Sequence, residues 1–238
     1  MFGAAEEVTG SNYLLEGEFS EKTTRLLVDC GFFQGSRISE EKNNEPFSYD
    51  PSSIDALLVT HAHLDHIGRI PKLVKNGFKG KIFSTPPTRD FARLMLVDSL
   101  GVLEKESKRN KRQEVIYNEK DVNTAMDLWE TARYGESFSI GGFNLVLKDA
   151  GHILGSAMVE ASPILQKETP APKVVFSGDL GNSPAPLLKD TEKINDADFL
   201  VIESTYGDRS HEDAEEADIN LERIIEKIVR RKGVLMIP

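Results

Sequence analysis

The sequence predicts a layered domain of mixed α/β (α+β) class. The chain has 238 residues, of which 39% are hydrophobic, and this is enough to bury a sizeable core. Short apolar runs compatible with β-strands alternate with longer segments whose apolar residues recur at helical spacing. The order is strands, helices, strands, a helix and a last strand, and helices of this length can cover the faces of a sheet.

The predicted strands are short apolar runs bounded by polar turns or glycine. The first two are separated by the polar turn 17–22, and the third, 54–60, has the apolar character of a buried strand. The predicted strands are 12–16, 24–31, 54–60, 81–85, 143–151, 156–162, 173–179, 198–205 and 234–238.

The predicted helices rest on apolar spacing and on residues that start or stop a helix. The first ends at Gly77, and the third begins with Asn118 as its cap and ends at Gly135. In the last helix, isoleucines at helical spacing face inward. The predicted helices are 65–77, 87–113, 118–135 and 219–233.

Charge and composition narrow the possible partners. The net charge is −10, and affinity for nucleic acid comes mostly from Lys and Arg, so an anionic substrate would need a local positive centre such as a metal ion. The single cysteine, Cys30, cannot form an internal disulfide, which agrees with a reducing compartment. No apolar run reaches the length of a membrane span and no leader is recognisable, so we expect a cytoplasmic protein that does not enter a membrane.

A dense cluster of metal-ligand residue types follows the predicted strand 54–60. Three of the five histidines of the chain, His61, His63 and His66, lie within six positions together with Asp65. Neutral imidazole and carboxylate are preferred ligands of zinc and similar metals. The alternative is a solvated loop that is rich in histidine by chance, but a cluster of this density after an apolar strand favours a metal site.

Two further residues stand at the ends of predicted strands. His152 follows the strand 143–151 between glycines, and Asp179 ends the strand 173–179. Either residue alone is more often structural. One short loop cannot easily surround an ion, however, so a second contribution is needed and these two residues are the candidates.

The motifs together resemble the metallo-β-lactamase superfamily. The stretch THAHLDH matches its HxHxDH signature, and DCG at Asp29, His152 and Asp179 follow in the right order. The stretches GAAEEVTGSNYLLE, GHILGSAM, FSGDLG and IESTYGDR are similar to its β-CASP branch of RNA-processing nucleases. The resemblance implies a four-layer αββα sandwich with two zinc ions at one edge.

The resemblance also implies a role for each site residue. His61, His63 and His152 would hold the first zinc, Asp65 and His66 the second, and Asp179 would bridge both. Asp65 would thus take part in catalysis, Glu203 would support proton transfer, and Asp29 would orient a ligand without touching the metal. Imidazole and carboxylate ligands suit zinc without excluding manganese or iron.

The implied function is a zinc-dependent ribonuclease. A metal-bound hydroxide would hydrolyse phosphodiester bonds of RNA, as an endonuclease, a 5′-exonuclease or both. One alternative is another hydrolase on the same scaffold, such as a thioesterase, and another is a non-catalytic scaffold subunit of an RNA-processing complex. The basic stretch 105–112 could contact RNA, although a solvated helix end is the simpler interpretation.

One departure from the family pattern shapes the predicted domain organisation. The family takes a further histidine for the second zinc from a segment beyond an inserted β-CASP domain, and His211 matches no ligand motif. We therefore expect 1–238 to be the N-terminal portion of a metallo-β-lactamase-like domain without the β-CASP domain, with weak or no activity alone. A homodimer is expected for the full-length protein.

Overall fold

A computed structural model describes residues 1–20, 22–36, 41–109, 115–165, 171–182, 184–185, 187–209 and 214–237. The chain forms two compact units, Met1–Glu203 and Ser204–Pro238. The predicted basic stretch 105–112 lies only partly within the described residues, and His211 lies outside them. None of the described helices combines the length and apolar character that crossing a membrane requires.

The first sheet of unit 1 has the order β1-β2-β3-β4-β5. Strands β1 (Tyr13–Phe19) and β2 (Lys22–Val28) form an antiparallel hairpin, as the sequence predicts. Strands β3 (Ala56–Leu58), β4 (Lys81–Ser84) and β5 (Trp129–Thr131) continue the sheet in parallel. Parallel strands place their carboxyl ends at one edge, so the residues that follow β2 and β3 come close together there.

The second sheet has the order β10-β9-β8-β7-β6. Its antiparallel members are β6 (Ser137–Ile140), β7 (Phe143–Asp149), β8 (Ala157–Pro163) and β9 (Val174–Phe176). The short strand β10 (Phe199–Val201) pairs in parallel with β9.

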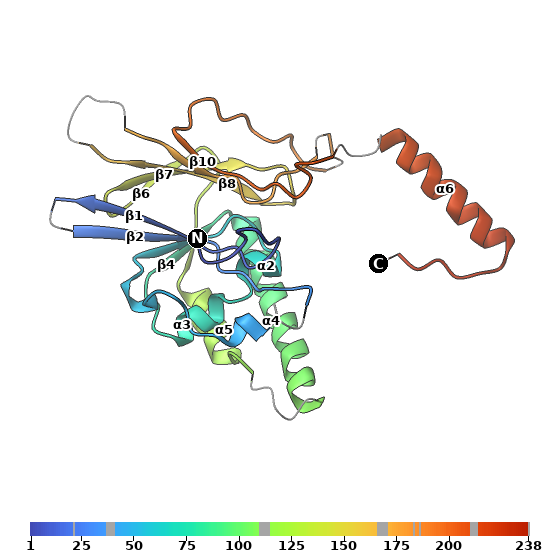
Figure 1. Ribbon diagram of the computed structural model, residues 1–238, viewed down its shortest axis with the longest axis horizontal. Coiled ribbons are helices and arrows are strands. Elements are labelled where there is room, and N and C mark those ends of the chain that lie inside the picture. Colours follow the sequence, from blue (N-terminus) through green and yellow to red (C-terminus); the bar gives the residue numbers. More distant parts are fainter. Residues whose placement is uncertain are drawn as a thin grey trace. The chain divides into compact units, whose positions relative to one another are not determined.

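The two sheets pack face to face with helices on the outer side of the first sheet (Figure 1). Successive residues of a strand point to opposite faces, so Leu26 and Leu58 enter a cluster with Leu145 and Val159 of the second sheet. Their neighbours enter a second cluster with the helices, and Leu57 is one of them. Unit 1 thus shows three of the four predicted layers, one helical layer and two sheets.

The helices of unit 1 are α2 (Leu64–Ile67), α3 (Ile70–Lys75), α4 (Pro86–Arg109) and α5 (Glu119–Asp127), with 3₁₀ turns at Lys42–Asn44 and Pro51–Ser53. The predicted helix 65–77 is divided in two, because Arg69 leaves helical geometry and Pro71 starts a new helix. The Asn118 cap of α5 is confirmed, and Asp121 completes a capping box with it.

The helix predicted for 118–135 is too long, the strand predicted for 234–238 is wrong, and two strands, β5 and β6, have no counterpart among the predicted elements. The helix predicted for 118–135 ends at Asp127, because buried Trp129 starts β5 and its Nε1 donates to Ser84 Oγ at 2.8 Å. Strand β6 was not predicted, and its alternation of exposed and half-buried residues is a weak signal. The strand predicted for 234–238 is not formed at 234–237: Val234, Met236 and Ile237 are exposed, and these residues have no hydrogen-bonded strand partner within the described part of the chain, which leaves out Pro238.

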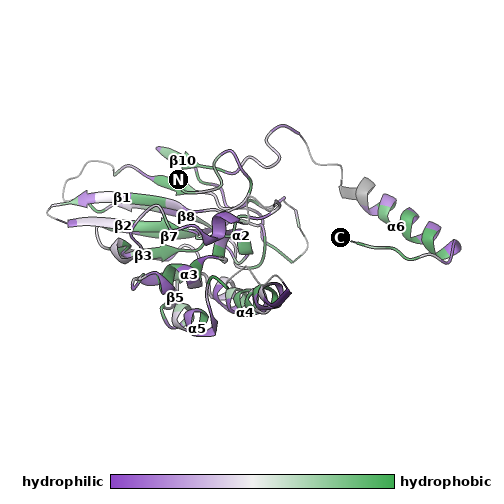
Figure 2. Ribbon diagram, turned by 60° about the horizontal axis from the view of Figure 1, so that its bottom comes forward, coloured by the Kyte–Doolittle hydropathy of each residue, from purple (hydrophilic) through white to green (hydrophobic). Residues whose placement is uncertain are grey.

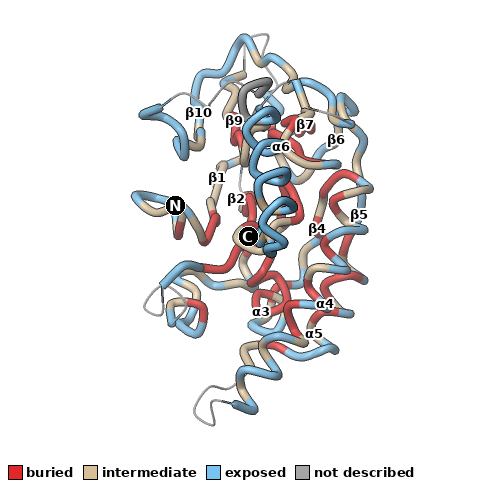
Figure 3. Tube along the Cα trace, turned by 90° about the vertical axis from the view of Figure 1, so that its right-hand side faces the viewer, coloured by how far each residue is buried: buried red, intermediate tan, exposed pale blue. Residues whose placement is uncertain are grey.

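Unit 2 contains the helix α6 (Ala214–Arg230), which confirms the predicted helix and begins five residues earlier. Figure 2 shows both hydrophobic and hydrophilic residues around α6, and Figure 3 shows that it is exposed along most of its length. Its apolar residues include Ile224 and Ile225, each more than two-fifths exposed. An amphipathic helix of this kind could cover one face of a sheet with its apolar residues. The second helical layer, which is the fourth layer of the sandwich, stays a prediction.

Candidate metal centre

The cluster predicted after strand β3 lies at the carboxyl edge of the first sheet. His61 is completely buried, and His63 lies immediately before the helix α2, which carries Asp65 and His66. Asp29 follows the neighbouring strand β2 and is also completely buried. The backbones pack closely here, because a Cβ added at Gly31 would lie 1.5 Å from the carbonyl oxygen of Asp65. Only glycine fits at that position.

One group of four side chains combines residues from both sheets. Its members, His61, His63, His152 and Asp179, can each offer one ligand atom within 4.8 Å of the others. His63 Nδ1 lies 3.0 Å from His61 Nε2 and 3.2 Å from His152 Nε2. Asp179 Oδ2 lies 3.7 Å from the Nε2 atoms of His61 and His152. A tetrahedral zinc with Zn–N bonds of about 2.0–2.1 Å separates its ligand atoms by about 3.3 Å, so this donor set fits such an ion.

A second group of three side chains shares Asp179 with the first. Asp65, His66 and Asp179 also offer ligand atoms within 4.8 Å of one another. His66 Nε2 lies 3.2 Å from Asp179 Oδ1 and 3.7 Å from Asp65 Oδ2. The two oxygens of Asp179 therefore face different groups, Oδ2 the first and Oδ1 the second. This is the arrangement that a carboxylate bridging two cations requires.

Burial favours the neutral, metal-binding form of His61 and His152 in the first group. Burial lowers the pKa of His61 well below its usual value, and the charges of His66 and His63 lower it further. Burial also lowers the pKa of His152, although Asp179 opposes the shift. The Thr60 hydroxyl donates its hydrogen to Asp29 Oδ2. The same hydroxyl lies 3.1 Å from His61 Nδ1, and because its hydrogen is already used it accepts a hydrogen bond from that nitrogen. The lone pair of His61 is then on Nε2, the atom that faces the group.

The second group has a different electrostatic character. Burial alone would lower the pKa of His66, but the charge of Asp29 and hydrogen bonds with Asp179 and Asp29 raise it to about 10. Burial raises the pKa of Asp65. Burial would also raise the pKa of Asp179, but the hydrogen bond with His66 and the histidine charges lower it. The carboxylates that hold a proton on His66 supply the negative charge that a bound cation needs.

Asp29 holds the second group in place without belonging to it. His66 Nδ1 donates to Asp29 Oδ2 at 2.8 Å, which directs Nε2 toward Asp65 and Asp179. Asp29 also accepts from the backbone N–H and the hydroxyl of Thr60, at 2.8 and 2.7 Å. Its backbone is in the left-handed region with φ at 59°, a conformation that costs a non-glycine residue about 1–2 kcal/mol. These hydrogen bonds offset that strain.

Glu203 lies beside the first group rather than within it. Its Oε1 accepts from the backbone N–H of Leu180 at 2.8 Å, and its own N–H donates to Ser177 Oγ at 3.1 Å. The carboxylate therefore links the end of β10 to the residue that follows Asp179. The structure shows it supporting the loop of a candidate ligand, and the predicted role in proton transfer stays a prediction.

Several supporting residues have no motif in the sequence. Thr60 contacts Asp29 and His61, and the hydroxyls of Thr85 and Thr88 both donate to the carbonyl oxygen of Gly155, in the loop that carries His152. Thr60 could have been noticed, because it is a polar residue at the end of an apolar strand. Thr85 and Thr88 carry no such signal, because their partner lies about 70 residues away along the chain.

Comparison with known proteins agrees with the predicted fold. The family model of the metallo-beta-lactamase superfamily matches residues 6–123. Ribonuclease TTHA0252 of Thermus thermophilus is 38% identical over 237 residues, which cover 100% of this chain and 50% of that protein.

Two further relatives come from an archaeon and an animal. Transcription termination factor FttA of Methanocaldococcus jannaschii is 33% identical over 90% of this chain and 33% of its own length. Cleavage and polyadenylation specificity factor 73 of Drosophila melanogaster is 30% identical over 99% of this chain and 32% of its own length. The chain thus spans between a third and a half of the length of these curated relatives. It belongs to the metallo-β-lactamase superfamily and to its β-CASP branch.

Proposed function

We propose that this chain carries the metal-binding part of a zinc-dependent ribonuclease that hydrolyses phosphodiester bonds of RNA. The observation that carries the proposal is the pair of donor groups joined by Asp179, one with three imidazoles and the other with an imidazole and a carboxylate. Two metal ions held by neighbouring donor groups that share one carboxylate suit an in-line displacement at a phosphate. Relatives named as ribonuclease and as cleavage factor support RNA as the substrate.

The residues of the chain divide the work between binding and orientation. His61, His63 and His152 hold one ion, Asp65 and His66 hold the other, and Asp179 contacts both. When bound, zinc supplies Lewis-acid charge and lowers the pKa of coordinated water toward neutrality. When bound, two divalent ions would carry more charge than the two donor carboxylates, Asp65 and Asp179, so the loaded site would attract a phosphate even though the chain carries a net charge of −10.

Two acidic residues support this arrangement from outside the donor groups. Asp29 fixes the orientation of His66, and Glu203 supports the loop after Asp179; a role of Glu203 in proton transfer is part of the proposal. We also propose the cytoplasm as the location, since the single cysteine is free and buried, and a homodimer for the full-length protein. The assignment of 1–238 to the N-terminal portion of one metallo-β-lactamase-like domain, without a β-CASP domain, is likewise a proposal.

The test measures metal content and substrate choice on the same preparation. We expect up to two equivalents of zinc and slow cleavage of single-stranded RNA that stops on chelation, with no turnover of a thioester. Turnover of the thioester without RNA cleavage would assign the site to a different hydrolase. Purification without metal, under conditions in which a zinc-supplemented sample also stays empty, would favour a scaffold subunit.

A further inference from the structure

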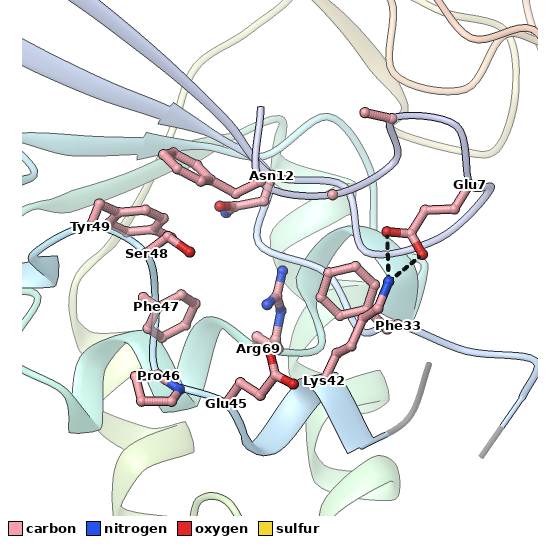
Figure 4. A pocket seen from close by; sticks show the side chains of 13 residues that line it. Glu7, Asn12, Phe33, Lys42, Glu45, Pro46, Phe47, Ser48, Tyr49 and Arg69 are labelled. Atoms are coloured by element: carbon pink, nitrogen blue, oxygen red, sulfur yellow. Dashed lines mark hydrogen bonds and ion pairs between the residues drawn. The ribbon is translucent and has the colours of Figure 1, made fainter. Parts of the chain in front are cut away.

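A cavity of about 240 Å³ lies between the N-terminal loop, residues 42–49 and Arg69 (Figure 4). We call it the Arg69 pocket. None of the candidate metal ligands lines it. It shares a wall with the metal centre, because Asn12 lines the pocket and its Nδ2 donates to the backbone carbonyl of Asp29 at 2.8 Å.

Arg69 is a buried cation with unused hydrogen-bond donors. Its residue is 5% exposed, and the guanidinium lies 4.5 Å from the ring centre of Phe33 and 5.5 Å from that of Phe47. Figure 4 shows the side chain extending between these two rings. Its Nε donates to Gly31 and its Nη2 to Gly10, in both cases to a carbonyl oxygen, so two of its five N–H groups have acceptors. Among the described residues it has no carboxylate partner.

Two neutral polar groups at the pocket lack partners as well. The hydrogen bond from Asn12 Nδ2 to the backbone carbonyl oxygen of Asp29 fixes the orientation of the Asn12 amide. Its Oδ1 is then buried and accepts no hydrogen bond from the described part of the chain. The Tyr49 hydroxyl is also buried without a well-formed hydrogen bond there, although it lies beside the side chains of Asn12 and Cys30. Buried polar groups are nearly always hydrogen-bonded, and each one left without a partner costs about 1–3 kcal/mol. The pocket therefore combines a cation, an acceptor and a hydroxyl that a ligand could satisfy together.

The charges around the pocket favour an anion inside it. Lys72 is 6% exposed, lies 5.1 Å from the ring centre of Phe47, and donates only to the backbone carbonyls of Asn43 and Glu45. It adds a second buried positive charge without a carboxylate partner among the described residues. Two carboxylates line the pocket. That of Glu7 forms an ion pair with Lys42 at 2.9 Å, and Glu45 is an exposed residue.

We propose that the Arg69 pocket binds a phosphate group that keeps a hydroxyl hydrogen. Its charged oxygens would accept from the free N–H groups of Arg69 and from Tyr49, and its P–OH would donate to Asn12 Oδ1. Hydrogen phosphate carries such an O–H at neutral pH, whereas sulfate of the same shape and charge carries none. The cavity has room for more than bare phosphate, so the monoanion of a small phosphate monoester, which keeps a P–OH and makes up about a tenth of a mononucleotide at pH 7, is a second source of the same group. The proposal does not depend on the proposed nuclease activity.

The test is calorimetric titration at pH 7 with inorganic phosphate, sulfate and a mononucleotide. Each is added to the zinc-loaded chain and to the chain stripped with a chelator, because metal ions also bind phosphate. We expect phosphate to bind in both states, at least tenfold more tightly than sulfate, because sulfate leaves Asn12 Oδ1 without a donor. Tighter binding of the mononucleotide than of inorganic phosphate would identify a phosphorylated molecule as the source, and the reverse would identify free phosphate.

Three variants separate the pocket from the metal centre. Arg69→Lys keeps the charge but loses the forked donor and should weaken phosphate binding at least tenfold. Tyr49→Phe removes a hydroxyl that has no well-formed hydrogen bond in the protein, so it should fold normally and weaken binding about fivefold. The exposed control Arg93→Lys should change nothing. Equal affinity for phosphate and sulfate, binding that needs zinc and ignores Tyr49→Phe, or no binding at millimolar phosphate would each overturn the proposal.

Discussion

The metal centre and the Arg69 pocket lie on the two sides of one short segment, Ser11 and Asn12. They differ in how far their buried polar groups are hydrogen-bonded within the protein. In the centre, Asp29 is completely buried and accepts three hydrogen bonds, and His66 lies between two carboxylates. In the pocket, and within the described ranges of the chain, Arg69 donates to carbonyl oxygens and lies over aromatic rings without a carboxylate partner. The centre is thus held in place by bonds within the protein, whereas the pocket leaves bonds open.

The two donor groups of the metal centre also differ in how completely the protein surrounds an ion. The first group has three imidazoles and one carboxylate, which is enough to surround a tetrahedral ion. The second group has one imidazole and two carboxylates, so it leaves a position open, as catalytic metal sites do. Asp179 belongs to both, and this makes it the residue whose loss should have the largest consequence.

The largest effect is expected from Asp179→Ala. Both groups lose a ligand, so bound zinc should fall from two equivalents to less than one, and RNA cleavage should fall by about 10³-fold or more. Elemental analysis and an RNA cleavage assay measure the two quantities on one preparation. Asp127→Ala, a change at an exposed aspartate, serves as the control and should keep both values. Retention of two equivalents in Asp179→Ala would show that this carboxylate does not bridge.

Asp29→Asn should separate the two groups. It removes the negative charge behind His66 and reaches the first group only through Thr60 and His61, so affinity should fall by about 10–100-fold for one equivalent of zinc and by clearly less for the other. Competition titration with a chromogenic chelator measures both affinities. His63 lies in the first group, so His63→Ala is the matched comparison and should weaken the other equivalent. Equal weakening of both equivalents by Asp29→Asn would contradict the separate roles.

The unchanged chain should release zinc in two phases. The group with three protein ligands should release its ion first, with an affinity about tenfold lower than that of the group with four. A chelator titration followed by the absorbance of the zinc complex resolves the phases. Release of two equivalents in a single phase would mean that Asp179 couples the ions too strongly for the groups to be distinguished.

Much of the fold and of the site could be predicted because the relevant signals are local. The HxHxDH motif places His61, His63, Asp65 and His66 within six residues, and the strand ends are marked by glycine. Parallel pairing then brings these ends to one edge of the sheet. The convergence of His152 on this edge follows from the order of the strands.

The features that escaped prediction depend on partners far away in sequence. Strand β5 exists because Trp129 pairs beside Ile82, a contact between residues more than 40 positions apart, and a local helical pattern hides it. Residues 234–237 are apolar enough for a strand but have no partner strand among the described residues. The Arg69 pocket combines single residues of the first 69 positions, and no motif joins them.

The smallest effect concerns a buried cation beside the pocket and the pH dependence of stability. Burial, followed by the charge of Arg69, lowers the pKa of Lys72 from 10.5 to about 8. Between these two values the unfolded form of Lys72 binds more protons than the folded form, so Lys72 contributes a free energy of unfolding that rises with pH across that window, whereas Cys30, whose pKa is raised by burial from 9.0 to about 11, contributes a fall above pH 9. The backbone carbonyls that accept from Lys72 favour its charged form, so we expect Lys72 to contribute a rise of about 1 kcal/mol between pH 8 and 10.

Lys72→Met should remove this rise, because methionine does not titrate. Denaturant unfolding of both proteins at pH 8 and 10 measures the difference, and the exposed control Lys79→Met should keep the rise of the unchanged chain. If Lys72→Met and the unchanged chain show the same pH dependence, the positive charge of Lys72 is compensated in the folded protein. In that case only Arg69 would supply the uncompensated charge of the pocket, and the contrast with the metal centre would rest on that single residue.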